Sequence, residues 1–342
     1  MRCQGQRLQK KEIYTAHVYL SILIPVLDQA EQLRKLLATI LTPENSALPF
    51  EVIVCDDGSS EPLTVASPVR LIRHDVAHGA SAARNTAASE AQGQVFLFLD
   101  ADTLLLRGSI SHVIARFQVE PDLAAINGGA HLEPADPESG FAARYRALID
   151  HVQQNIRAPQ TCSFFTTRCG AIRKELFLAS GRFNERFRGA TVEDYEFGHR
   201  LAGLAAIRFD PKISIQHHYG GFKRICRNYF TRVRGWTALF VKRPNFDNYG
   251  SATGAAGIGS IMGVLWLPAL LLPAPMRSIA AAISFGGFFL GYRDIFFWSY
   301  RLKGLLFLVR TVAITWFLCW VIVAAAVLGA LQGIISTPVK EE

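Results

Sequence analysis

Short apolar runs alternate with amphipathic segments along the first hundred residues of the chain. Residues 29–41 and 81–91 place apolar side chains at the spacing of one helix face. The runs between them are apolar and partly β-branched, as buried strands are. The four candidate strands are residues 19–26, 50–55, 69–73 and 95–99. Strands that alternate with helices predict parallel β-α-β units, and therefore an α/β domain with helices on both faces of its sheet.

The pattern changes near residue 250, where long uncharged runs begin. The runs without a charged side chain are Gly254–Pro273, Ser278–Tyr292 and Thr311–Ile335. A bilayer core takes ~20 apolar residues per helix, so the third run suffices, the first is barely long enough and the second is short. Runs without a polar face are hard to bury in a soluble domain, and they predict about three membrane helices. Two spans with a re-entrant hairpin, or buried core helices, are the alternatives.

Composition excludes several classes of protein. The chain has 342 residues, of which 50% are hydrophobic and 19% charged, so it is too apolar to be disordered and long enough for about two domains. Its six cysteines form no CxxC pair, which argues against a disulfide scaffold and against cysteine metal sites. They are expected to be reduced thiols of a cytosol-facing protein.

The positive charge is concentrated just before the uncharged runs. Residues 208–243 contain nine Lys/Arg and one acid, Asp210, an excess equal to the net charge of +8 of the whole chain. Apolar residues recur in this segment at helical spacing from Phe222 to Phe240. The segment predicts a basic amphipathic helix on a membrane surface, with a solvated helix face as the alternative.

Basic residues in the connecting segments predict the orientation. They gather before the first run and between the second and third, with only Arg277 between the first two. The positive-inside rule then places the α/β domain in the cytosol at the inner (cytoplasmic) membrane, with three spans and the C-terminus outside. Residues 1–18 are basic without an apolar segment, which predicts a tail and not a signal peptide.

Acidic side chains stand where the predicted strands end. Asp57 follows the second strand, and Asp100 and Asp102 follow the fourth. Ligands of parallel sheets bind beyond the carboxyl ends of the strands, so these carboxylates are candidates for one site. Asp100 and Asp102 suit Mg²⁺ or Mn²⁺ together with phosphate oxygens, although aspartates also begin turns for local reasons.

Five motifs in order give the acids a context. They are ILIPV (22–26), CDDGSSE (55–61), HGASAARN (78–85), FLDADT (98–103) and VEDYEFGHRL (192–201). Over residues 19–240 the sequence resembles the inverting, family-2 nucleotide-sugar glycosyltransferases with the GT-A fold. The resemblance implies a Rossmann-like domain of the nucleotide-diphospho-sugar transferase type that binds a nucleotide-sugar donor with Mg²⁺ or Mn²⁺.

The resemblance also implies roles on the donor side. Asp57 would bind the nucleobase or ribose, with a plain β-turn as the structural alternative. Asp102 would be the direct metal ligand, with Asp100 nearer the ribose. Arg84 would lie near the nucleotide or be a structural ion-pair partner. The other positions carried over are Pro25 and Val26 at the base pocket, and Gly79 and Asn85 near the nucleotide.

Further matches concern the acceptor and the diphosphate. Asp194 would be the base that takes the proton of the acceptor hydroxyl, supported by Glu193, although acids also stabilise a helix start. His217, or else His218, would complete the metal shell. The candidate arginines for the diphosphate or an anionic headgroup are Arg232 and Arg234, with Arg224 and Arg227 beside them.

Three positions depart from the family pattern. Asp28 replaces the asparagine common after the first strand, and Cys169 replaces an asparagine near the acceptor. Processive polymer synthases carry Q-x-x-R-W, whereas residues 232–236 read RVRGW. A single-sugar transfer is therefore favoured.

The sequence thus predicts an α/β GT-A domain followed by an all-α membrane segment. The expected divisions are a tail at 1–18, the GT-A domain at 19–220, an interfacial helix region at 221–250, the membrane region at 251–336 and a tail at 337–342. The expected partners are a nucleotide-sugar, a lipid-linked or glycan acceptor and a membrane. A non-catalytic membrane subunit of a polysaccharide or glycolipid assembly machine is the alternative. A nucleic-acid binder is disfavoured, because the basic charge adjoins the predicted bilayer.

Overall fold

A computed structural model describes residues 18–136, 138–157, 160–162, 164–187, 193–242 and 253–335. Nearly all of the expected N-terminal tail and the whole expected C-terminal tail lie outside these residues. So do Arg243 and the segment 188–192 that precedes the Glu193-Asp194 pair.

The first half of the α/β domain is the parallel arrangement that the sequence predicts. Four neighbouring strands run in the order β3-β2-β1-β4, and each pair among them is parallel. Their bounds are β1 Leu20–Val26, β2 Phe50–Asp56, β3 Arg70–Arg73 and β4 Val95–Leu99. Helices α1 (Ala30–Ile40) and α2 (Ala80–Ser89) connect them, as expected. The carboxyl ends of these strands therefore meet at one edge of the sheet.

The second half of the sheet is mixed. The full order is β3-β2-β1-β4-β8-β6-β9-β5, with β7 beside β9, and β8 is antiparallel to both β4 and β6. The strand bounds are β5 Thr103–Leu105, β6 Ala125–Ala130, β7 Thr161–Cys162, β8 Cys169–Arg173 and β9 Ile207–His217. The helices are α3 Ser109–Val119, α4 Gly140–His151, α5 Lys174–Ala179 and α6 Glu193–Ala202, with short turns at Pro43–Asn45 and Val152–Ile156. Separate apolar clusters, one including Leu36 and Phe117 and the other Phe177 and Phe197, pack against the sheet.

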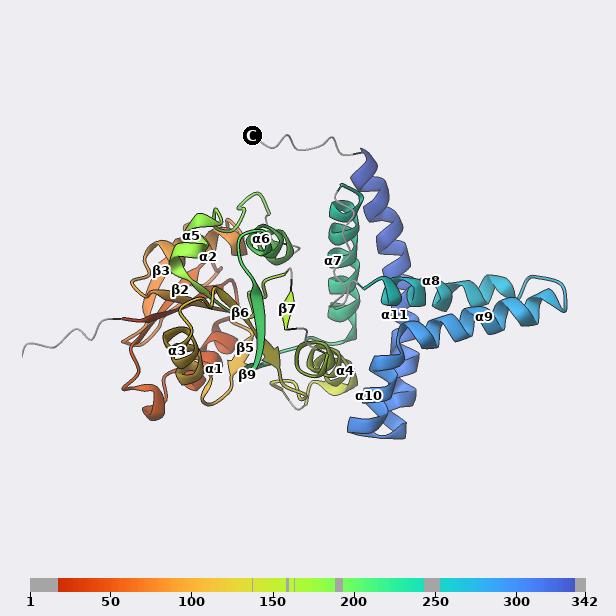
Figure 1. Ribbon diagram of the computed structural model, residues 1–342, viewed down its shortest axis with the longest axis horizontal. Coiled ribbons are helices and arrows are strands. Elements are labelled where there is room, and N and C mark those ends of the chain that lie inside the picture. Colours follow the sequence, from red (N-terminus) through yellow and green to blue (C-terminus); the bar gives the residue numbers. More distant parts are fainter. Residues whose placement is uncertain are drawn as a thin grey trace, which may run out of the picture.

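The chain ends in a helical region beside this domain (Figure 1). Its helices are α7 Phe222–Lys242, α8 Gly254–Ala269, α9 Met276–Gly291, α10 Arg293–Lys303 and α11 Leu305–Ile335. Helices α7 and α11 lie side by side, and α8 and α9 form a hairpin that points away from the sheet. The expected α/β domain followed by an all-helical region is confirmed.

Fewer described helices are long and apolar enough to span a membrane than the sequence predicted. Among the described residues, α11 alone is long and apolar enough to cross a bilayer. Helices α9 and α10 pass the same test only as a pair, bent by 63°. Helix α8 has 16 residues and is shorter than a full span. The expectation of three full spans is therefore not met, because turns at Pro273–Pro275 and Tyr292 divide the apolar sequence.

Candidate active site

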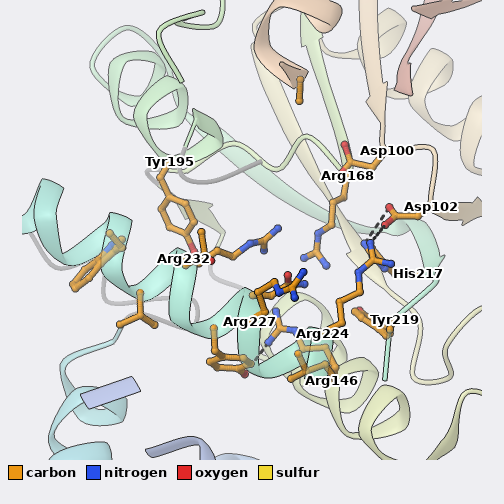
Figure 2. Close-up of a pocket in the computed structure, with 18 of the residues that line it drawn as sticks. Asp100, Asp102, Arg146, Arg168, Tyr195, His217, Tyr219, Arg224, Arg227 and Arg232 are labelled. Atoms are coloured by element: carbon orange, nitrogen blue, oxygen red, sulfur yellow. Dashed lines mark hydrogen bonds and ion pairs between the residues drawn. The ribbon is translucent and has the colours of Figure 1, made fainter. Parts of the chain in front are cut away.

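A cavity of 580 Å³ opens between the carboxyl edge of the parallel strands and helix α7. One wall consists of Pro25, Val26 and residues 100–102 at the strand ends, and the opposite wall of α7 side chains. Figure 2 shows the carboxylates and His217 facing a group of arginines across this space. The sequence-predicted base-pocket residues and strand-end acids therefore lie on one cavity.

Arg84 connects the donor-side and acceptor-side acids. Its guanidinium donates to Asp100 Oδ1 at 2.8 Å and to Glu193 Oε1 at 3.1 Å. Burial opposes ionisation of Asp100, but the charge of Arg84 and its hydrogen bond outweigh burial, so the pKa of Asp100 is lowered. The ion-pair alternative for Arg84 is thus realised, although its side chain also lines the cavity. Asp100 and Glu193, which are 93 positions apart in the sequence, thus form ion pairs with the same arginine.

Asp102 and His217 form a second contact at the same edge. His217 Nε2 lies 3.4 Å from Asp102 Oδ1, and an Arg224 nitrogen lies 3.8 Å from the other carboxylate oxygen. The neighbouring His218 instead places Nδ1 2.6 Å from Asp136 Oδ2. His217, and not His218, is therefore the histidine beside the strand-end acids. Within the described part of the chain no three His, Cys, Asp or Glu side chains form a ready metal cluster.

Asp57 lines the cavity with both oxygens engaged by its own chain. It accepts hydrogen bonds from the backbone of His78 at 3.0 Å and of Gly79 at 2.7 Å, and it lies 2.8 Å from His74 Nδ1. Gly79 has φ +104° at the start of α2, a conformation that favours glycine. Asp57 thus fixes the loop that closes this side of the cavity.

Asp194 begins helix α6 at the edge of the cavity. Burial and the neighbouring Glu193 raise the pKa of Asp194 to about 6, against the opposing charges of Arg232 and Arg84. Glu193 is buried and accepts a hydrogen bond from Arg84. Tyr195, the residue after Asp194, lines the cavity. Glu193 and Asp194 are not themselves among the described lining residues. The pair therefore adjoins the cavity through two lining residues, its chain neighbour Tyr195 and the Glu193 partner Arg84.

Helix α7 contributes the arginines. Arg224, Arg227 and Arg232 line the cavity and point toward Asp102 and His217 (Figure 2). Arg234 does not: its Nε donates to Gln332 of α11 at 2.8 Å. Residues two apart on a helix project about 200° from one another, so Arg232 and Arg234 cannot share a face. The grouping of Arg234 with Arg232 at a diphosphate is corrected.

Two further predicted positions lie elsewhere. The Asn85 side-chain amide donates to the Phe183 carbonyl at 2.9 Å and to Glu185 at 2.8 Å, so it holds a loop and not a nucleotide. Cys169 is buried in β8 within the core, where burial raises the pKa of its thiol to about 12. Cys169 is not among the described residues that line the cavity. Asp28, at φ +53°, accepts from both the backbone and hydroxyl of Ser60.

A buried charge network beside the α7 arginines was not apparent from the sequence. The Asp150 carboxylate is 1% exposed and forms ion pairs with Arg146 and Arg168 at 2.6 Å each. It also accepts a hydrogen bond from the Tyr219 hydroxyl at 2.6 Å. The two guanidinium charges lower the pKa of Asp150 against its burial. Only the i,i+4 spacing of Arg146 and Asp150 on α4 was visible beforehand. The five described cysteines form no disulfide with one another, as expected.

The fold and the site define a class. A mixed sheet with carboxylates at the ends of its parallel strands and a cavity above them is a GT-A-like domain. Residues 21–179 match the family described as Glycosyl transferase family 2. The expected fold class is thereby confirmed, and the match supports the expected enzyme class.

Characterised relatives are distant. The chain is 25% identical over 233 residues to a pre-mycofactocin glycosyltransferase of Mycobacterium tuberculosis, covering 65% of this chain and 45% of the relative. It is 28% identical over 222 residues to a hyaluronan synthase of Pasteurella multocida, covering 54% of this chain and 23% of that one. The chain thus spans less than half the length of these relatives.

One solved structure is similar over most of the chain. It is the mannosyltransferase PcManGT from Pyrobaculum calidifontis, in complex with GDP-Man and Mn²⁺, with a TM-score of 0.53 and 15% identity. The alignment covers 92% of this chain and 87% of that one. At this identity the likeness establishes the shared fold.

Proposed function

We propose that this protein is a membrane-anchored, inverting glycosyltransferase that moves one sugar from a nucleotide-diphosphate sugar to a lipid-linked or other membrane-proximal acceptor. The observation that carries the proposal is Arg84, which joins Asp100 at the donor strand ends to Glu193, the neighbour of Asp194. An inverting displacement needs a leaving-group site and a base on one cavity, and Arg84 links those two regions.

The donor occupies the strand-end wall in this proposal. Pro25, Val26 and the loop held by Asp57 contact the nucleoside. Asp102 fits a divalent cation, because its carboxylate forms no hydrogen bond with the described residues and faces His217. Mg²⁺ or Mn²⁺ often takes only one or two protein ligands besides phosphate oxygens, which agrees with the missing third side chain. Asp102 and His217, with Asp100 adjacent, would hold the cation, whose positive charge would stabilise a diphosphate leaving group.

Asp194 acts as the base. Its carboxylate accepts the proton of an acceptor hydroxyl while that oxygen forms a bond to the anomeric carbon. The bond from that carbon to the diphosphate oxygen breaks, and its electron pair leaves with the nucleoside diphosphate. A pKa of about 6 keeps Asp194 ionised at neutral pH yet basic enough to accept a proton. Arg232 holds the departing diphosphate from α7.

The acceptor enters from the helical region. The cavity continues from the arginines to Ser260, Tyr292, Ile322 and Ala326, on α8, α11 and the turn between α9 and α10. An acceptor with an anionic headgroup and an apolar chain matches this change from guanidinium groups to an uncharged lining, in which the hydroxyls of Ser260 and Tyr292 lie 2.7 Å from each other beside Ile322 and Ala326. We place the α/β domain in the cytosol at the inner membrane, in agreement with the basic residues around the uncharged runs.

The proposal is tested with purified protein and a panel of nucleotide-sugars, with Mn²⁺, Mg²⁺ or EDTA. We expect one donor to be hydrolysed or transferred only with metal, and Asp102→Asn to reduce that rate at least ~100-fold, because it removes a charged ligand. Asp122→Asn, at an exposed acid outside the cavity, is the matched control. A chain that bound no donor would instead be the non-catalytic subunit of an assembly machine.

A further inference from the structure

Helix α11 is the one described helix that passes the length test for a membrane span, yet it packs on α7 and on α4 of the α/β domain. From its middle to its C-terminal end it runs beside α7: the rings of Phe317 and Phe222 are 5.2 Å apart, and a Cβ at Gly333 would meet the Ala238 carbonyl oxygen at 2.9 Å. Its N-terminal half contacts α4, where the hydroxyls of Thr315 and Tyr145 are 3.1 Å apart. Figure 1 shows α7 between the α/β domain and the upper part of α11, with α4 and α10 beside its lower part.

A bilayer crossed by α11 would therefore enclose part of the domain. The enclosed groups would include the ion pair between Arg157 and Asp294, which joins α10 to the domain. The arginines of α7 would be enclosed as well. Ionised side chains inside hydrocarbon cost several kcal/mol each, and irregular backbone is not tolerated against lipid. The contacts of α11 thus argue against a span.

The α8–α9 hairpin has the opposite properties. It points away from the domain in Figure 1 and carries no charge from Gly254 to Tyr292 except Arg277, just after its turn. Each helix has 16 residues, or about 24 Å, close to the ~30 Å of a hydrocarbon core once the turn is added. Its large apolar side chains are exposed, including Ile283 at 63% and Leu271 at 88%.

The packing within the hairpin is also that of membrane helices. A Cβ at Gly291 would lie 2.5 Å from the Cα of Gly259, so the two backbones approach closely at small residues. At the base of the hairpin, α10 exposes Arg293 and Arg301 beside Phe297 and Tyr300. Basic and aromatic side chains of this kind fit an anionic headgroup layer.

We infer that the α8–α9 hairpin is the membrane-inserted element and that α11 lies along the bilayer surface. An apolar stripe of α11 then rests on the lipid: Val309, Phe317, Trp320, Val327, Leu331 and Ile334 are exposed at intervals of three to eight residues. A hairpin crosses or re-enters without changing sides, so both ends of the described chain lie on the side of the α/β domain. This rests on the proposed membrane association and replaces the three-span topology.

The experiment is protease protection of the full chain in membrane vesicles whose domain side faces outward. One cleavable epitope is placed before Met1 and a second after Glu342. Cleavage of the first epitope identifies the domain side. We expect the second epitope to be cleaved equally well, and the protein to stay with the membranes after a high-salt wash. Protection of the second epitope would show that α11 spans and would overturn the inference.

Variants test the hairpin separately. Ile283→Glu places a charge on its exposed face and is expected to lower the membrane-retained fraction at least about twofold. Val119→Glu, at a 78% exposed apolar residue of α3, is the matched control and should change nothing. Unchanged retention of Ile283→Glu, with donor binding intact, would also overturn the inference. A wild-type chain found in the soluble fraction, alone or as an oligomer covering its hairpin, would contradict the membrane association itself.

Discussion

The ionised Asp194 carboxylate lowers the stability of the folded state at neutral pH. Its pKa of about 6 lies above the ordinary value of 3.8, so the folded state disfavours the ionised form. The cost is absent below about pH 4 and complete above about pH 6. We expect Asp194→Asn to raise the free energy of unfolding by about 2 kcal/mol at pH 7.5 and by almost nothing at pH 4. Thermal unfolding at the two pH values measures this difference.

Activity should depend on pH through the same group. Because the base must be unprotonated, kcat/KM of the wild type is expected to fall tenfold per pH unit below about pH 6. Asp194→Asn should lose transfer and still bind donor. A stabilised but fully active Asp194→Asn variant would exclude this residue as the base.

Asp150 illustrates a charge that stabilises the fold. Asp150→Asn removes the carboxylate charge that pairs with both Arg146 and Arg168, and we expect a loss of about 3 kcal/mol in unfolding free energy at pH 7.5. Because the wild-type pKa is lowered, this contribution is present above about pH 4 and is lost as the pH falls further. Chemical denaturation at pH 7.5 measures it, with Asp122→Asn as control. Equal stability of the two variants would contradict the account.

At the residue scale, sequence could locate the acids but not their partners. Asp57, Asp100 and Asp102 were found because parallel strands end at a common edge, and that rule is local. Whether Asn85 or Arg84 faces the cavity depends on the rotation of α2 about its axis. Which face of the sheet Cys169 occupies depends on the pleat of β8, a strand that the sequence did not predict. Asp150, Arg146 and Arg168 were missed because burial of a charge is a tertiary property.

At the element scale, the half of the sheet beyond β4 escaped prediction. Strands β6 (AINGGA) and β8 (CGAIR) contain glycines where a run of β-branched residues would indicate a strand. These glycines allow close approach: a Cβ at Gly128 would meet the Ile213 carbonyl oxygen at 2.7 Å. These glycines are required by contacts with residues that are distant in the sequence, and a single sequence does not show such contacts.

Helix α6 depends on a glycine of this kind. A Cβ at Gly198 would lie 2.5 Å from the Cα of Phe164, against backbone that cannot move aside. We expect Gly198→Ala to displace the helix that carries Asp194, costing about 2 kcal/mol of stability and at least ~10-fold in kcat. Gly203→Ala, just beyond the same helix and with its nearest contact at 3.4 Å, is the control for unfolding and steady-state measurements. Wild-type kcat in Gly198→Ala would show that α6 does not position the base.

At the scale of the whole molecule, hydropathy predicted the helical region but not its arrangement. Uncharged runs located α8, α9 and α11 closely. Their lengths suggested that α11 spans, and only its contacts with α4 and α7 argue otherwise. Periodicity predicted α7 as a basic amphipathic helix, yet Arg224, Arg227 and Arg232 turn toward the α/β domain. The domain and the helices thus share one cavity, which neither half of the sequence contains alone.

This shared cavity makes the acceptor site separable from the donor site. Gly257 lines the cavity on α8, and a Cβ there would meet no atom within 4 Å, so a side chain can leave the helix at this point and Gly257→Trp narrows the distal end of the cavity. We expect the KM for a lipid-linked acceptor to rise at least ~10-fold, while donor binding and metal-dependent donor hydrolysis are unchanged. Gly254→Trp, equally open but outside the cavity lining, is the matched control. An acceptor KM that Gly257→Trp leaves unaltered would mean that the acceptor does not pass between α7 and α8, and that the acceptor meets Asp194 from the solvent side of α6.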